Sequence, residues 1–164
     1  MNHHINNLLN TIPEKEQALL AIFKILQFED IYSNTALALA CIDHVESKKE
    51  DKYNCILLLL KYGSTPNVRN SVTGFTPLHW AARYGELEIV KLLYEYDAKL
   101  CIPDRNGYLP IDYAGMFKQE NVVEFLLNIM YTQVLHTLAN SDDFKHIDKD
   151  VLNKHIAECN NEVK

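Results

Sequence analysis

The chain lacks an apolar run long enough to cross a membrane. Its 164 residues are 48% hydrophobic, but runs such as Ile56 to Leu60 are far shorter than the ~20 apolar residues of a transmembrane helix. Residues 1–7 also lack the basic stretch and apolar core of a secretory signal. We therefore expect no membrane insertion. We expect a cytoplasmic or nuclear protein, or one in a host cytosol if a microbe delivers it.

Positive charge is also scarce. Sixteen lysines and arginines stand against 22 acidic residues, which gives a net charge of -6, and arginine is rare. A protein that follows nucleic-acid phosphates needs a basic face, so we expect no nucleic-acid partner. The charged fraction of 23%, with both signs present, argues against a disordered chain.

The four cysteines, Cys41, Cys55, Cys101 and Cys159, include no CxxC pair. This scatter favours free thiols in a reducing compartment over a disulfide framework. Cys41 stands at a small core position and is expected to be buried. Cys55, beside the apolar run, is expected to be buried or half-buried, and Cys101 falls in a connecting loop where it could be exposed.

Catalytic motifs are missing as well. The sequence has no glycine-rich phosphate loop, no HExxH and no GxSxG. His3 and His4 lie at the terminus, and His136, His146 and His155 lack the spacing of a metal site. We therefore predict no catalytic residue, no cofactor and no metal, and an enzyme that uses His and Cys groups is the least favoured class.

The chain repeats itself at a lag of 33 residues. At this lag, turn residues align with turn residues and apolar residues align with apolar residues. The matched pairs are Gly74 with Gly107, Pro77 with Pro110, Leu78 with Ile111, Ala81 with Ala114, Ile89 with Val122, Val90 with Val123, Leu92 with Phe125 and Leu93 with Leu126. A less regular copy lies upstream, where Ser33 aligns with Gly74. Seven extra residues fall within 45–54 of that copy, and their charge predicts a solvated helix extension or loop.

Each copy predicts two short helices joined by a tight turn. Thr76 followed by Pro77 marks a helix start, because a threonine hydroxyl caps a free N–H and proline fits the first turn. Gly85 ends that helix, since glycine readily adopts the left-handed conformation. The predicted inner faces comprise Leu78, Ala81 and Ala82 in the first helix and Leu87, Val90, Leu92 and Leu93 in the second. One such hairpin cannot bury its own apolar face, so three or more must stack.

The third copy departs from the pattern of the second. Leu109 replaces the capping threonine, Asp112 the histidine, Gly115 an alanine and Lys118 the turn glycine. We expect Asp112 to recover part of the lost cap through the helix dipole. Asp97 replaces a terminal glycine in the second copy and is expected to adopt the left-handed conformation.

The phrase GFTPLHWAARYGELEIVKLL at 74–93 resembles an ankyrin repeat almost position for position. The resemblance extends over 71–103, then over 104–127, and less closely over 30–70. It implies an all-α solenoid of stacked helix-turn-helix units joined by short finger loops. We predict a single domain over 1–164 with degenerate helical caps at 1–29 and 128–164. Apolar spacing predicts helices near 5–10 and from Pro13 to Leu26, one long helix near 120–139, and a last helix near 144–158.

Ankyrin arrays bind other proteins through the finger tips and the adjoining concave face of the first helices. The resemblance therefore implies a candidate binding surface, at positions where the fold does not require apolar residues. It comprises Ile31, Tyr32, Asn34, Ile42, Asp43, Val72, Thr73, Phe75, Arg83, Tyr84, Arg105, Asn106, Tyr108, Met116 and Phe117. Enrichment in aromatic residues, Met and Arg is typical of protein interfaces. Hot spots are expected among Phe75, Tyr84, Tyr108 and Phe117, whereas Trp80 is expected to pack between repeats.

The resemblance also assigns two single residues. It implies that His79 is a structural hydrogen-bonding residue. It further implies that Asn67 could be a substrate for asparaginyl hydroxylation, the alternative being a loop asparagine bonded to backbone. The prediction as a whole is a non-enzymatic, monomeric module that binds another protein. Two alternatives stay open: a regulatory or targeting segment of a larger protein, suggested by the long helix past Leu127, and a stoichiometric inhibitor of a signalling protein.

Overall fold

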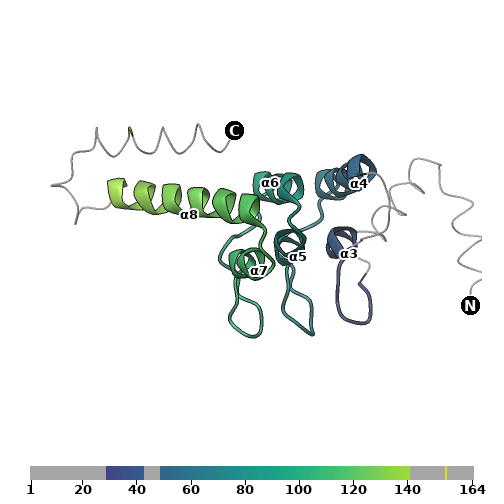
Figure 1. The fold of residues 1–164 in the computed structure, drawn as a ribbon. Helices are drawn as coiled ribbons and strands as arrows, with labels where there is room; N and C mark the ends of the chain where they lie inside the picture. The colour runs from purple at the N-terminus through teal and green to yellow at the C-terminus, as the bar shows by residue number, and fades with distance from the viewer. Residues whose placement is uncertain (1–28, 43–48, 141–153, 155–164) are drawn as a thin grey trace, which may run out of the picture.

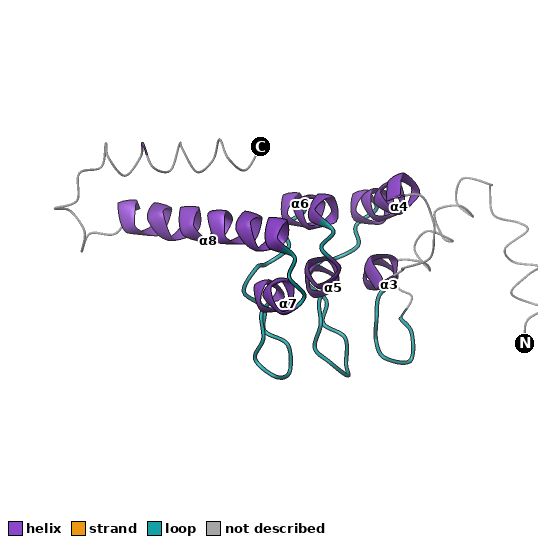
Figure 2. Cartoon of the chain, in the orientation of Figure 1, coloured by secondary structure: helices purple, strands orange, loops and turns teal. Residues whose placement is uncertain are grey.

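A computed structural model describes residues 29–42, 49–140 and Lys154 (Figures 1 and 2). The helices of this part of the chain are α3 (Ala36–Ile42), α4 (Lys49–Lys61), α5 (Pro77–Tyr84), α6 (Leu87–Glu95), α7 (Pro110–Met116) and α8 (Glu120–Asn140). The described residues contain no strand beyond an isolated bridge between Glu29 and Thr35. The all-α prediction is confirmed.

The helices form three hairpins that lie side by side in two layers. Figure 1 shows α3, α5 and α7 in one layer and α4, α6 and α8 in the other. Neighbouring helices pack within each layer, and each first helix packs on the second helix of its own hairpin. A loop before each first helix projects from the same edge as a finger (Figure 2). The stack of parallel hairpins predicted from the repeat is therefore confirmed.

The core lies between the two layers and runs through all three hairpins. Ala81 and Ala82 of α5 are fully buried, as are Val90 and Leu93 of α6. Two adjacent alanines leave α5 a thin inner face, so its neighbours can approach closely. Leu87, predicted to lie inside, is only half-buried. Burial of one Leu or Val side chain is worth roughly 1.5–3 kcal/mol, so these buried side chains contribute strongly to the stability of the stack.

Equivalent backbone positions in the fingers adopt the left-handed conformation. Ser33, Gly74 and Gly107 have φ values of 59°, 79° and 90°, which confirms the alignment of the upstream copy with the other two. Asp97, with φ 65°, adopts the predicted left-handed conformation. Lys118, with φ 56°, does the same in place of the turn glycine. Non-glycine residues pay a steric penalty there, so the third copy keeps its geometry at some cost in stability.

Successive fingers are hydrogen-bonded to each other through their main chains. The N–H of Ser71 donates to the carbonyl of Tyr32 at 2.9 Å, and the N–H of Arg105 donates to the carbonyl of Thr73 at 2.9 Å. These bonds involve main-chain atoms, so they fix the relative position of the fingers whatever side chains their tips carry.

Two helices, α4 and α8, extend beyond the regular length of the repeat. Lys49–Asn54 form the first turns of α4, so the described part of the charged insertion is a helix extension. The long helix predicted near 120–139 is confirmed by α8. The predicted helices within 1–28 and near 144–158 lie outside the described residues, Lys154 excepted. Among the helices that are described, none has the length and apolarity to span a bilayer.

Candidate functional site

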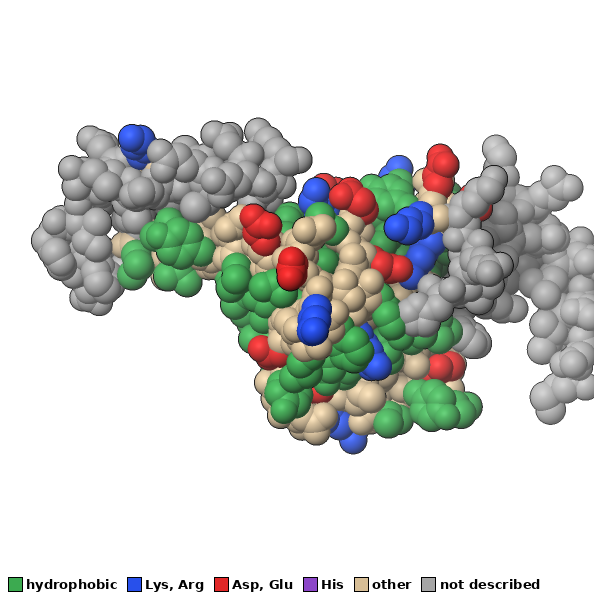
Figure 3. Space-filling model, viewed as in Figure 1, with side chains coloured by type: hydrophobic (Ala, Val, Ile, Leu, Met, Phe, Trp, Pro, Cys, Tyr) green, Lys and Arg blue, Asp and Glu red, His purple; other side chains and the backbone are tan. Residues whose placement is uncertain are grey.

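The finger face is the surface formed by the fingers at 29–35, 70–76 and 104–109 and by the outer sides of α3, α5 and α7. Figure 3 shows hydrophobic side chains spread over the part of the molecule where α7 and the fingers lie. Large apolar side chains stand exposed there, led by Ile31 at 86%. The others are Tyr32, Val72, Tyr108, Met116 and Phe117.

The predicted surface residues fall into three groups. Tyr32, Val72, Arg105, Asn106, Tyr108, Met116 and Phe117 are exposed. Thr73, Arg83, Tyr84 and Ile42 are half-buried, and Asp43 lies outside the described residues. Phe75 and Asn34 are buried, so the prediction that these two side chains face a partner is wrong.

Phe75 is part of the packing that joins a finger to its helix. Its side chain is only 5% exposed. Its ring stacks on His79 with centroids 5.1 Å apart and contacts Trp80 and Tyr113, each with centroids 4.7 Å apart. The repeat pattern placed Phe75 in a finger but could not show that its ring turns back beneath the finger to meet Tyr113 of the next unit.

Asn34 is buried in a polar network at the finger bases. Its side chain is 6% exposed, and its Oδ1 accepts a hydrogen bond from Asn70 Nδ2 at 2.9 Å. The Asn34 N–H donates to Asp30 Oδ1 at 2.8 Å. The bond from the Asn34 side chain is the main cause that lowers the pKa of Asp30. Asn34 therefore links the first finger to the second.

A short polar residue opens each finger, a feature that the sequence analysis missed. Asp30, Asn70 and Asp104 each accept N–H groups of the turn that follows. Asp104 also accepts the hydroxyl of Tyr113 at 2.7 Å. Burial by itself raises the pKa of Asp104, but the bonds from Tyr113 and from the turn outweigh it and lower that pKa. The signal lay in the spacing: each residue stands three or four positions before the left-handed one.

His79 connects α5 to the next finger. Its side chain is fully buried, and Nδ1 accepts the Thr76 N–H at 3.0 Å. Nε2 lies 3.3 Å from the Tyr108 carbonyl oxygen, so we assign the proton of the neutral ring to Nε2. Burial lowers the pKa of His79, which agrees with a neutral ring. The structural role that the resemblance implied for His79 is confirmed.

Asp112 takes the place of His79 in the third unit. Its Oδ2 accepts the N–H of Leu109 at 2.7 Å, just as His79 Nδ1 accepts that of Thr76. The expected recovery of the cap therefore comes from a direct hydrogen bond, and not only from the helix dipole.

Arg83 lies among three aromatic rings between α5 and α7. Its guanidinium carbon is 4.6 Å from the ring centroid of Phe117 and 5.9 Å from those of Trp80 and Tyr84. The rings of Trp80 and Tyr84 stack with centroids 6.1 Å apart. These distances suit cation–π attraction, worth about 0.5–1 kcal/mol at an exposed site. Arg83, Tyr84 and Phe117, three of the residues predicted for the binding surface, thus form one cluster. Trp80, which belongs to the same repeat as Arg83 and Tyr84, packs against both of them.

Asn67 connects, by hydrogen bonds, the loop that precedes the second finger to the loop that precedes the third. Its Nδ2 donates to the Asp97 carbonyl at 2.9 Å, and its Oδ1 accepts the Lys99 N–H at 2.8 Å. These bonds are those of a loop asparagine held by backbone. Hydroxylation of Asn67 stays a prediction.

The described cysteines differ in exposure. Cys41 is buried as predicted, and burial raises its pKa to about 12. Cys101 is exposed, as its loop position suggested. Cys55 is exposed too, and the prediction that it is buried or half-buried is wrong, because the inner side of α4 is taken by Ile56 and Leu60. Cys159 lies outside the described residues.

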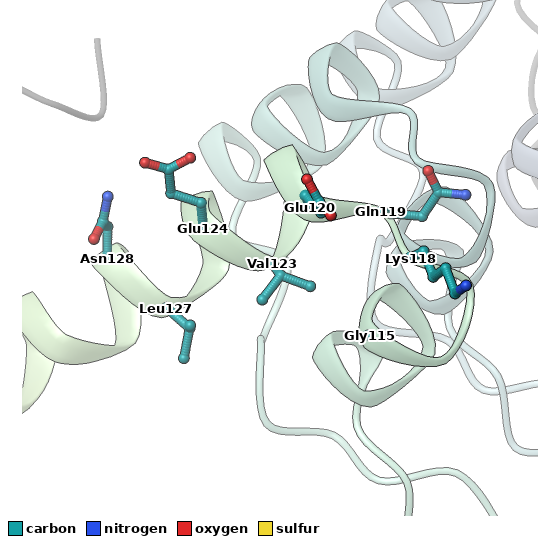
Figure 4. Close-up of a pocket in the computed structure, with 8 residues that line it drawn as sticks. All are labelled: Gly115, Lys118, Gln119, Glu120, Val123, Glu124, Leu127 and Asn128. Carbon is teal, nitrogen blue, oxygen red and sulfur yellow. The ribbon is translucent and has the colours of Figure 1, made fainter.

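A shallow groove of about 520 Å³ runs between α7 and α8 (Figure 4). Figure 4 shows Glu120 and Glu124 on one side of α8 and Leu127 on the other, with Lys118 in the turn before the helix. No histidine or cysteine lines the groove. Throughout the described ranges, His, Cys, Asp and Glu side chains nowhere gather in threes as metal ligands would. The groove therefore offers contact area and charge, without a nucleophile paired to a base.

Comparison with known proteins identifies the repeat. The family model for ankyrin repeats (3 copies) matches residues 44–138, more than half of the chain. Inversin from Homo sapiens is 33% identical over 92 residues, which cover 56% of this chain and 9% of Inversin. Cyclin-dependent kinase inhibitor 2A from Monodelphis domestica is 37% identical over 73 residues, 44% of this chain and 43% of the inhibitor.

A third relative is the phosphate system positive regulatory protein of Saccharomyces cerevisiae. It is 31% identical over 109 residues, which cover 65% of this chain and 9% of that protein. This chain thus matches only a small part of its long relatives. The repeat at a lag of 33, the stacked hairpins and the family match agree: the chain belongs to the ankyrin-repeat family.

Proposed function

We propose that the chain is a non-enzymatic protein-binding module that uses its finger face. Ankyrin repeats are in general modules for protein–protein interaction, and this array presents large apolar side chains where its fold does not need them. One observation carries the proposal: Ile31, Tyr32, Val72, Tyr108, Met116 and Phe117 are all exposed on this single face. The module acts as a monomer in the cytoplasm or nucleus and does not bind nucleic acid.

The binding energy is expected to concentrate in part of the face. Tyr108 and Phe117 are exposed aromatic residues, and Tyr84 belongs to the Arg83 cluster. Hot spots are enriched in Trp, Tyr and Arg, so we place the centre of the site at Arg83, Tyr84, Tyr108 and Phe117. Phe75, although first expected among them, supports the surface from below.

Affinity capture tests this proposal. The full chain is immobilised and bound proteins are identified by mass spectrometry, with wild type compared against Tyr108→Ala/Phe117→Ala. Each substitution at a true hot spot weakens binding by about 2 kcal/mol, or about 30-fold. The matched control is Leu58→Ala/Tyr62→Ala, which removes two exposed apolar side chains from α4 and the turn that follows it, on the other layer. Equal retention of partners by both double variants would remove the finger face from consideration.

Stoichiometric inhibition of a signalling protein is a second candidate function. The similarity to a protein named cyclin-dependent kinase inhibitor 2A, of which the matched residues cover 43%, favours it. An inhibition assay with purified cyclin-dependent kinases, with and without an excess of this chain, tests it. Full kinase activity at saturating chain would end this candidate and leave the broader binding function standing.

A regulatory or targeting segment within a larger protein is the other alternative. It is supported by Inversin and the yeast regulatory protein, in each of which the matching region is 9% of the whole. Sequencing of full-length transcripts tests it: a further folded domain in the same reading frame supports this alternative, and a stop codon directly after Lys164 ends it.

A further inference from the structure

We propose that the open end of the stack binds an amphipathic helix of a partner protein, which lies along α8 and presents lysine or arginine to Glu120 and Glu124. The open end comprises the residues that line the groove between α7 and α8, together with Tyr131 and Val134 further along α8. None of them is among the residues predicted for the finger face, so the inference goes beyond the proposed function.

In the earlier hairpins, the surface equivalent to the open end is covered by the next hairpin. Leu60, Tyr94 and Leu127 occupy the same position in three successive second helices, and α4 packs on α6 as α6 packs on α8. Leu60 is 4% exposed, Tyr94 is half-buried and Leu127 is 52% exposed. Likewise, Ala82 is fully buried and its equivalent Gly115 is exposed. The open end is therefore a surface that this fold otherwise covers with a helix.

The contact between α6 and α8 shows how such a helix lies. Tyr94 and Lys91 of α6 both meet Phe125 of α8: the two ring centroids are 6.4 Å apart, and Lys91 Nζ lies 6.0 Å from the Phe125 centroid. One repeat later, the equivalents of Tyr94 and Lys91 are Leu127 and Glu124. A helix that docks on α8 as α8 docks on α6 therefore brings its side chains to both Leu127 and Glu124.

An apolar stripe continues along α8 beyond the groove. Leu127, Tyr131 and Val134 all stand exposed, and steps of four and three residues place them on one face of the helix. Figure 3 shows hydrophobic side chains at the surface where α8 extends past α7. Two helices pack along a seam with this spacing, so the stripe suits a second helix.

Charge at the open end defines the flank of the partner helix. Residues 110–140, which form the third hairpin, include three carboxylates and one lysine, Lys118, and no arginine. Glu120 and Glu124 are exposed on one side of the groove (Figure 4). Asp112, the third carboxylate, stands where His79 of the second hairpin reaches the next unit. Neither ion pair among the described residues involves these groups, so a basic flank complements the open end.

A second copy of this chain complements the open end less well. Helix α8 contains Glu120 and Glu124 but no lysine or arginine. Two α8 helices paired along the apolar stripe therefore supply no cation to either carboxylate. For this reason we assign the open end to a different protein and treat self-association as an outcome of the test.

Binding of helical peptides to the full chain tests the inference. The probes are three fluorescent peptides as long as α8, which has 21 residues. Each has Leu at alternating steps of three and four residues, with Lys/Arg, Gln or Glu at the flanking positions. We expect the basic peptide to bind about tenfold more tightly than the neutral one, and the acidic peptide to bind most weakly. A basic peptide that binds no better than the neutral one overturns the inference.

Apolar substitutions test whether the peptide lies on α8. Leu127→Ala/Val134→Ala should weaken binding of the basic and neutral peptides by about tenfold. The matched control is Leu58→Ala/Tyr62→Ala, which removes two exposed apolar side chains from the first hairpin and should leave binding unchanged. Circular dichroism verifies the fold of each variant. Equal affinities in the two double variants would place the peptide elsewhere and refute the proposed site.

Charge substitutions test the flank of the partner helix. Glu120→Gln/Glu124→Gln should remove most of the preference for the basic peptide. The matched control, Glu50→Gln/Asp51→Asn, removes two exposed carboxylates from the first turn of α4 and should keep that preference. An equal loss in both variants would mean that the basic peptide responds only to the net charge of the chain, which also overturns the inference.

The remaining outcomes separate this inference from the proposed function. Peptide binding that is lost in Tyr108→Ala/Phe117→Ala but kept in Leu127→Ala/Val134→Ala belongs to the finger face, so the inference fails and the proposed function stands. The inference also fails if no peptide binds, as expected where another segment of this chain occupies the open end. A dimer in light scattering that Leu127→Ala/Val134→Ala dissociates assigns the open end to a second copy instead. Affinity capture judges the proposed function independently of the peptides.

Discussion

The second and third hairpins have the same backbone but differ in the residues that build it. The second uses Thr76 and His79 at the start of α5, and the third uses Leu109 and Asp112 at the start of α7. In both, the side chain three positions into the helix accepts the N–H of the capping residue. The difference is that His79 also reaches the next finger at Tyr108. The first hairpin, which a finger also follows, has Ala38 at the equivalent position, so this side-chain contact with the next finger distinguishes the second hairpin.

The largest expected difference between the two hairpins lies in the core. Leu78 is fully buried, and its equivalent Ile111 is half-buried. Leu78→Ala should lower the free energy of unfolding by about 2–5 kcal/mol, because it leaves a cavity between hairpins. Ile111→Ala should cost about 1 kcal/mol. Urea denaturation followed by circular dichroism measures both, and equal losses would mean that the last hairpin is packed as tightly as the second.

The next largest difference concerns the residues that follow the helix starts. His79→Ala leaves the Thr76 N–H and the Tyr108 carbonyl without their partner in a buried place, which costs about 2–3 kcal/mol. Asp112→Ala removes one exposed capping bond and costs about 1 kcal/mol. The same denaturation experiment compares them. His79→Gln, which keeps a donor and an acceptor, is the control and should recover part of the loss.

Acid should affect the two hairpins in different pH ranges. His79 has a pKa lowered from its usual 6.5, so the unfolded chain takes up its proton first. Its contribution is complete above pH 6.5 and declines as the pH falls below that value, at most by about 1.4 kcal/mol per pH unit. Asp104, in the finger of the third hairpin, has a pKa lowered from 3.8. Its contribution holds above pH 3.8 and declines at lower pH.

Thermal melts from pH 7 to 3 separate these two contributions. The His79→Gln variant should lose the decline that begins near pH 6.5 and keep the one below 3.8. The Asp104→Asn variant should show the reverse. A wild-type melting temperature that does not change between pH 7 and 5 would contradict the buried neutral state of His79.

The smallest expected difference lies in the turns that end the first helices. Gly85, with φ 72°, and Lys118, with φ 56°, both adopt the left-handed conformation. Lys118→Gly should raise the free energy of unfolding by up to about 1 kcal/mol. Gly85→Ala should lower it by a similar amount, since the added Cβ also meets the side chain of Gln119. Changes in the same direction would show that the two turns are held differently.

The hairpins, their order and the long α8 were predictable because apolar spacing and turn residues are local signals. The direction of single side chains was harder to predict. Phe75 and Asn34 stand in fingers, and only the neighbouring units, through Tyr113 and Asn70, show that both are buried. Cys55 faces outward because of the way α4 is rotated about its own axis. A run of consecutive apolar residues does not define that rotation. The Arg83 cluster needs three residues from two hairpins at once, so no single repeat reveals it.

The main-chain bonds between successive fingers affect how this array could be redesigned. Because Ser71 and Arg105 hold their neighbours through backbone N–H groups, the identity of the side chains at the tips is almost independent of that bracing. Libraries that randomise Tyr32, Val72 and Asn106 should therefore yield mostly folded variants with new specificities. Randomising Asn34, Asn70 or Asp104 should instead yield mostly misfolded ones.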